Sequence, residues 1–84
     1  MMSNYTVACR KRMHLWISDS VSVESVAENT MEIAYQSHRA RLVFEPTRCA
    51  WSLHWGSNRL DGNFDRLTKR LRQILTTSPL EEEA

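Results

Sequence analysis

The sequence predicts an α+β fold, a small antiparallel sheet of three to four strands with two helices packed on one face. Three observations predict it. Apolar residues recur at helical spacing over residues 63–77, residues 22–38 divide into an apolar and a polar side, and three shorter stretches alternate as strands do. The expected order is strand, strand, helix, strand, strand, helix (ββαββα).

The C-terminal helix has the clearest pattern. Asn63 carries a side chain that caps free amides, and Pro79 stops a helix before it. The apolar side is formed by Phe64, Leu67, Leu71, Ile74 and Leu75. We therefore expect a single compact domain over residues 1–78 and a frayed acidic tail over 79–84.

Residues 22–38 fit two structures. Met31, Ile33 and Tyr35 alternate as in a strand. A helix over the same residues would instead gather on one side Val23, Val26, Ala27, Thr30, Ile33 and Ala34. Its other side would hold Glu24, Ser25, Glu28, Asn29, Glu32 and Gln36. Because the helical division uses the whole segment, we predict a helix there, capped by Ser22.

Three stretches alternate with the two-residue period of a strand, namely residues 12–18, 39–44 and 49–55. Pro46 and Thr47 join the last two as a hairpin, and residues 5–9 are expected to pair with the first. One face of the third stretch consists of Cys49, Trp51, Leu53 and Trp55. We expect this face in the core, because a small domain needs large aromatic residues for burial.

Length and composition indicate one globular domain. The chain has 84 residues, 42% hydrophobic and 25% charged, with a formal net charge of +1. That charge argues against a polyanion binder acting through bulk charge alone. Two cysteines outside any CxxC pair, and no secretory signal or span of about 20 apolar residues, predict a cytoplasmic protein with free thiols and no membrane segment.

No motif predicts an enzyme, a cofactor or a metal site. Cys9 and His14, and likewise Cys49 and His54, are five residues apart, so on a strand they point to opposite faces. GxSxG, HExxH, P-loop and GxGxxG sequences are missing. We expect no catalytic residues.

The sheet face away from the helices is the expected site. The predicted partner-binding residues are Arg12, His14, Trp16, Arg39, Arg41 and His54. A tryptophan among arginines suits recognition, since both are enriched at binding hot spots. We expect a regulatory or inhibitory protein-binding module that offers this basic, aromatic face to an acidic protein partner, with a homodimer as a further form.

Nucleic-acid binding is the alternative. The same face and the C-terminal helix would contact phosphates, with Trp16 stacking on a base. The residues for this alternative are Arg10, Lys11, Arg12, Arg66, Lys69 and Arg70. The near-neutral charge and the acidic residues Glu24, Glu28 and Glu32 favour the protein partner by a small margin.

Overall fold

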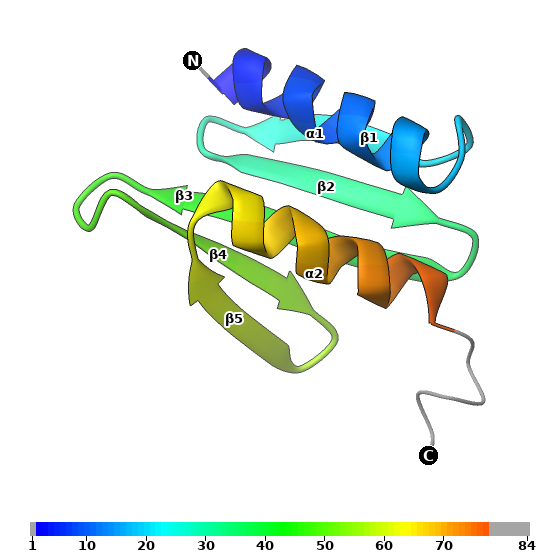
Figure 1. Cartoon of the computed structure of the whole chain (residues 1–84). Helices are drawn as coiled ribbons and strands as arrows, with labels where there is room; N and C mark the ends of the chain where they lie inside the picture. Colours follow the sequence, from blue (N-terminus) through cyan, green and yellow to red (C-terminus); the bar gives the residue numbers. More distant parts are fainter. Residues whose placement is uncertain (1, 78–84) are drawn as a thin grey trace.

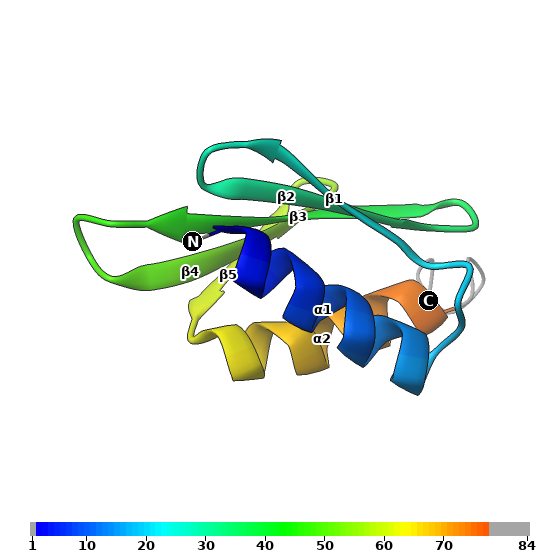
Figure 2. The same ribbon diagram turned by 90° about the horizontal axis from the view of Figure 1, so that it is seen from above.

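The computed structural model describes residues 2–77, in the order helix, five strands, helix. The elements are α1 (Met2–Trp16), β1 (Ser22–Ala27), β2 (Thr30–Tyr35), β3 (His38–Glu45), β4 (Ala50–Trp55), β5 (Asn58–Gly62) and α2 (Phe64–Thr76). Over this range the strands form one antiparallel sheet of order β1-β2-β3-β4-β5 (Figure 1). Both helices lie against the same face of it (Figure 2).

The expected α+β class and antiparallel sheet with two helices are confirmed, whereas the order ββαββα and the count of three to four strands are wrong. The expected domain boundary at residue 78 and the tail over 79–84 lie outside the described residues. No helix in the described part of the chain is long and apolar enough to cross a bilayer.

Helix α2 agrees with the prediction for residues 63–77 to within one residue at each end. Asn63 is its N-cap, with an extended backbone and a side-chain oxygen that accepts the Arg66 N–H at 2.8 Å. Its buried side is formed by Leu67, Thr68, Leu71, Ile74 and Leu75. This periodic apolar side holds the helix on the sheet.

Helix α1 replaces the strands expected over residues 5–9 and 12–18, and those predictions are wrong. Thr6, Cys9 and Met13 are buried at spacings of three and four, as on one side of a helix. Leu15, which the alternation placed beside Met13, is 82% exposed. Residues two apart point in different directions on a helix, so the apparent alternation does not describe a common face.

The helix expected over residues 22–38 is also wrong, because the segment is the hairpin of β1 and β2. Val23 lies opposite Ile33, and both are buried, as is Met31. Val26, which a helix would have buried, is 50% exposed next to a bulge in β1. The alternation of apolar residues therefore describes this segment correctly, since a strand places Val23, Met31 and Ile33 on the face covered by the helices.

Strands β3 and β4 form the expected hairpin, with Pro46 in the turn. Trp51 (5% exposed) and Leu53 (0%) lie in the core, as predicted. The ring centroid of Trp51 is 4.9 Å from that of Tyr5 in α1 and 5.2 Å from that of Phe64 in α2. This tryptophan therefore joins both helices to the sheet.

Two members of the predicted core face are placed differently. Cys49 is exposed in the β3–β4 turn with a φ of +47°, so its assignment to the core is wrong. Trp55 is half-buried at the end of β4 and packs against the core from its edge. The alternation over 49–55 thus begins one residue after the predicted start.

Candidate functional site

The six residues predicted for partner binding do not form one surface. Arg39, Arg41 and His54 alternate with buried residues of β3 and β4, so they lie on the side without helices, called here the open sheet face. The other three, Arg12, His14 and Trp16, belong to α1 on the opposite side. Their expected place on a strand of the open face is wrong.

Trp16 lies at the end of α1, next to Arg72 of α2. Its half-buried side chain packs against the core. The guanidinium carbons of Arg12 and Arg72 lie 6.0 Å and 5.8 Å from its ring centroid. These cations cover part of the ring, and Trp16 also lines an open cavity of about 530 Å³ between the ends of α1 and α2. Arg72 is not among the residues predicted from the sequence, although it lies one turn after Thr68 on the side of α2 that faces α1.

His14 is also held within the fold. Its Nε2 lies 2.9 Å from the Val21 carbonyl oxygen, and its Nδ1 lies 4.0 Å from Asp19 Oδ1. These contacts connect the end of α1 to the segment that leads into β1. His14 therefore has a structural role, since it fixes the end of α1 to the following segment.

The open sheet face carries both signs of charge. Glu32 pairs with Arg39 at 3.7 Å and with Arg41 at 3.2 Å, and His54 lies opposite Arg41 on the neighbouring strand. An open pocket of about 340 Å³ is lined by Glu32, Arg39, Ala40, Arg41, His54, Trp55 and Gly56. The carboxylate among these cations makes the pocket only weakly basic.

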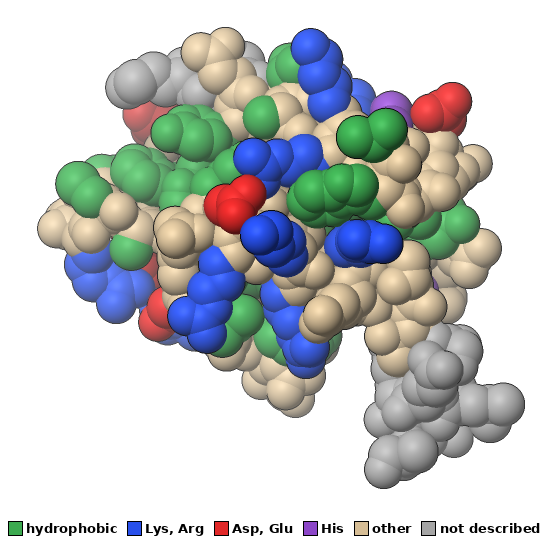
Figure 3. Space-filling model, in the orientation of Figure 1, with side chains coloured by type: hydrophobic (Ala, Val, Ile, Leu, Met, Phe, Trp, Pro, Cys, Tyr) green, Lys and Arg blue, Asp and Glu red, His purple; other side chains and the backbone are tan. Residues whose placement is uncertain are grey.

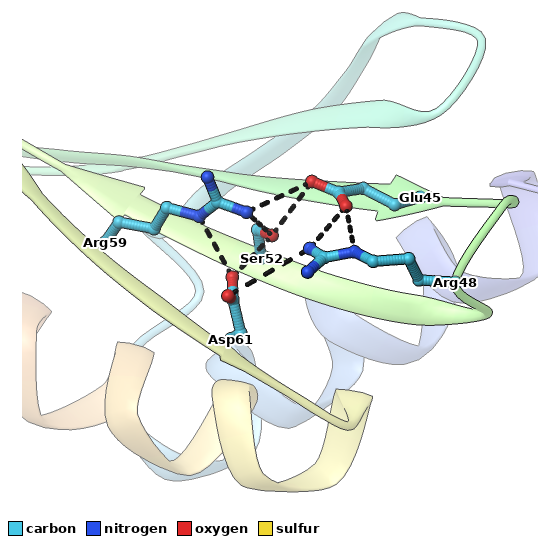
Figure 4. Close-up of polar contacts among 5 residues, drawn as sticks. All are labelled: Glu45, Arg48, Ser52, Arg59 and Asp61. Carbon is cyan, nitrogen blue, oxygen red and sulfur yellow. Dashed lines mark hydrogen bonds and ion pairs between the residues drawn. The ribbon is translucent and has the colours of Figure 1, made fainter.

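A polar network crosses β3, β4 and β5 on the same face (Figure 4). It consists of Glu45, Arg48, Ser52, Arg59 and Asp61. Ser52 is buried beneath it and lies 2.8 Å from Asp61 Oδ1, while Arg59 Nε donates to that oxygen at 3.0 Å. Glu45 Oε2 accepts from Arg48 Nε at 2.7 Å. These strands are thus linked by side chains as well as by their backbone.

The network lowers the pKa of Asp61. Hydrogen bonds from Ser52 and Arg59 to its carboxylate are the main causes, and the charges of Arg59 and Arg48 add to them. The carboxylate is therefore held ionised by these partners. Arg48 and Arg59 also pair with Glu45 in the same network, so the group behaves as a satisfied structural cluster.

The two helices carry most of the positive charge. The basic helix layer is defined here as Arg10, Lys11 and Arg12 of α1 with Arg66, Lys69, Arg70 and Arg72 of α2. The acidic residue of these two helices is Asp65. Figure 3 looks onto this side of the molecule, where Lys and Arg side chains gather over its centre. The structure thus brings all six residues of the nucleic-acid alternative into one layer.

The members of this layer differ in how strongly they are held. Arg10 donates to the Val23 carbonyl at 2.7 Å, and Lys69 pairs with Asp65 at 3.3 Å. Arg70 donates to Gln73 Oε1 at 2.8 Å, with its guanidinium carbon 5.5 Å from the centroid of Trp55. Lys11 and Arg66 are exposed, and their side chains have no polar partner among the residues described.

The cysteines lie in unlike surroundings. Cys9 is buried in α1, and burial raises the pKa of its thiol to about 12, against the opposing charges of Arg12 and Arg10. Cys49 is exposed in the turn. Within residues 2–77, three or more His, Cys, Asp or Glu side chains nowhere gather as metal ligands would. Cys9 and His14 share a helix, so the strand argument used for them does not apply.

No protein-family model, curated protein or solved structure matches this chain.

Proposed function

We propose that the chain is a small non-enzymatic binding module that contacts nucleic acid through its basic helix layer. The observation that carries the proposal is the charge of the two helices, on which seven Lys and Arg residues accompany the single acidic residue Asp65. Phosphate neutralisation by such residues supplies most non-specific affinity for nucleic acid.

The distribution of charge supports this partner better than the net charge does. The formal charge of +1 combines a basic helix layer with acidic residues elsewhere. Glu24, Glu28 and Glu32 belong to the β1–β2 hairpin, where Glu24 and Glu32 face away from the helices. The small net charge is therefore a weaker argument against nucleic acid than it was for the sequence alone.

The contacts within the layer divide it into structural and available groups. Arg12 is committed to Asp65 and Thr68, and Arg10 to the backbone of β1. Lys11 and Arg66 are exposed without described polar partners. Arg70 and Arg72 lie over indole rings and are exposed, and neither is paired with a carboxylate among the residues described. Four side chains thus form the proposed contact set.

Binding of an acidic protein partner to the open sheet face is the second candidate. It is favoured by Arg39, Arg41 and His54, three of the six predicted residues, which line one pocket. Glu32 in the same pocket pairs with both arginines and would repel an acidic segment. We therefore rank this function below nucleic-acid binding.

We also propose a cellular compartment for the protein. We place it in the cytoplasm, because Cys9 and Cys49 are free thiols and a reducing compartment keeps thiols in that state. We assign it no catalytic residue and no cofactor. A homodimer stays a prediction from the sequence.

Fluorescence anisotropy with labelled DNA at several salt concentrations tests the proposed function. The double variant Arg66→Gln with Arg70→Gln should bind DNA about tenfold or more weakly than the parent protein. The logarithm of affinity should fall linearly with the logarithm of salt concentration, by about 0.9 for each phosphate neutralised on duplex DNA. The double variant should have a shallower slope.

The matched control is Arg39→Gln with Arg41→Gln, which removes the same charge from the open sheet face. Its DNA affinity should stay within about twofold of the parent. Equal losses in the two double variants, or no binding at low salt, would show the proposal to be wrong. If the parent binds polyglutamate tightly and only the control variant loses this binding, an acidic protein partner is favoured.

A further inference from the structure

Two cavities adjoin along one side of α2. The first, of about 400 Å³, is lined by Leu60, Asn63, Asp65, Arg66, Lys69, Arg70 and Gln73. The second, of about 200 Å³, is lined by Trp55, Arg70, Gln73, Ile74 and Thr77. Arg70 and Gln73 line both, so the two form one groove, called here the α2–β5 groove. It follows the helix for about 20 Å, at 1.5 Å for each residue.

The groove is basic along its length. Arg66, Lys69 and Arg70 line it, and Asp65 is its acidic residue. The Asp65 carboxylate is compensated by Arg12 at 3.1 Å and Lys69 at 3.3 Å. The groove therefore offers the charge that attracts a phosphate backbone.

An aromatic ring stands at one end of the groove. Trp55 is half-buried, and Arg70 lies over its ring at 5.5 Å from the centroid. The same tryptophan lines a further cavity of about 420 Å³ with Ser37, His38, Arg39, Gly56, Asn58 and Ile74. Trp55 thus lines both the groove and this further cavity, and a planar group in the groove would contact the part of the ring that Arg70 leaves uncovered.

We propose that the α2–β5 groove binds single-stranded nucleic acid, with phosphates on Arg66 and Arg70 and an unpaired base against Trp55. This inference rests on the proposed function and specifies its partner. In a duplex the bases are paired and stacked, so they do not offer a free face to an indole, whereas a single strand does. At 3.4 Å for each nucleotide of a stacked strand, the groove accommodates on the order of six nucleotides.

The test compares labelled (dT)12 with a twelve-base-pair duplex by anisotropy, using the full chain. The parent should bind the single strand about fivefold or more tightly. Trp55→Leu should weaken single-strand binding about tenfold, the usual scale for loss of one stacked base, and leave duplex binding within about twofold. Trp55→Phe, which keeps a ring, should retain most of the affinity.

Trp16→Leu is the matched control, since it removes a half-buried tryptophan of the same basic side that lies outside the groove. It should not change the preference for the single strand. Circular dichroism verifies that each variant is folded, and Arg66→Gln tests the groove without altering the core. This exposed substitution should weaken (dT)12 binding about threefold.

The outcomes separate the inference from the proposed function. Equal affinity for both nucleic acids, unchanged by Trp55→Leu, would overturn the groove and leave nucleic-acid binding standing. Absence of binding to either nucleic acid would overturn both. Loss of single-strand binding in Trp55→Leu but not in Trp16→Leu supports the groove.

Discussion

Arg12 Nη1 donates to Thr68 Oγ1 at 2.8 Å and to Asp65 Oδ1 at 3.1 Å, so one guanidinium joins the two helices. Its central carbon also lies 5.2 Å from the ring centroid of Phe64. Thr68 is fully buried, and its own hydroxyl donates to the Asp65 carbonyl at 2.9 Å. Arg12 therefore orders the interface between α1 and α2.

Replacement of Arg12 should destabilise the fold. Arg12→Met keeps much of the apolar stem and removes the donors, so we expect a loss of about 1–2 kcal/mol in the free energy of unfolding. The melting temperature should fall by about 4–8 °C for each kcal/mol. Thermal unfolding followed by circular dichroism measures this. Arg66→Gln is the control and should melt within a few degrees of the parent; equal melting of Arg12→Met would contradict the assigned role.

The prediction from sequence succeeded where one periodicity dominated. In α2 the apolar residues repeat at helical spacing and Asn63 caps the first turn, so no competing pattern exists. In β4 the large side chains of Trp51 and Leu53 alternate with smaller ones, which placed them correctly in the core. Strong periodicity specified both elements, and Asn63 also marked the start of α2.

The prediction failed where exposed apolar residues imitated another period. Leu15 and Val26 are exposed, yet they completed the alternation of residues 12–18 and the helical side of 22–38. Arg12 added to the error, because a charged residue directed toward the second helix weakens the amphipathic pattern of α1. These packing choices depend on tertiary contacts and are not visible in a single sequence.

The candidate site followed from the fold assignment. Placing residues 12–18 on a strand put Trp16 on the same sheet face as Arg41, whereas α1 puts it on the other side of the sheet. The basic residues of the alternative set needed no such assumption for α2, where Arg66, Lys69 and Arg70 were expected on one helix. The roles proposed for Trp55 and Arg72 depend on which elements lie side by side, and the sequence alone does not show this.

The core position of Trp51 leads to a second prediction. Trp51→Ala should lower the free energy of unfolding by about 3–5 kcal/mol, because it removes contacts to both helices and leaves a cavity. Urea unfolding measures the loss. Leu15→Ala is the control, since Leu15 is 82% exposed and its truncation should change stability by less than about 0.5 kcal/mol. A large loss in Leu15→Ala would favour the strand over helix α1.

The cysteines should differ in reactivity. In the folded protein Cys49 should react rapidly with a thiol reagent, whereas buried Cys9 should react only after unfolding. Cys49→Ser should therefore remove the fast phase in an absorbance assay of thiol release. Rapid loss of both thiols in the native state would contradict the burial of Cys9.

Burial of Cys9 also makes the free energy of unfolding depend on pH in the alkaline range. Its folded pKa, about 12, exceeds the reference value of 9.0, so unfolding is accompanied by proton release above pH 9. The stabilising contribution is fully present below pH 9 and is lost as the pH rises toward 12. Urea midpoints at pH 8 and pH 10.5 should show a smaller decline in Cys9→Ala than in the parent.

Ser52 and Asp61 give the last prediction, which concerns the acid side. The pKa of Asp61 lies below 3.8 in the folded protein, chiefly because Ser52 and Arg59 hydrogen-bond to the carboxylate. Its contribution to stability is present above pH 3.8 and is lost as the pH falls through the folded pKa. Ser52→Ala removes one of the two hydrogen bonds, so the pKa of Asp61, followed by its carboxyl NMR signal, should move toward 3.8. Arg41→Gln, on the same face but outside the network, should leave that pKa unchanged. An unchanged pKa in Ser52→Ala would mean that the arginines alone hold the carboxylate ionised.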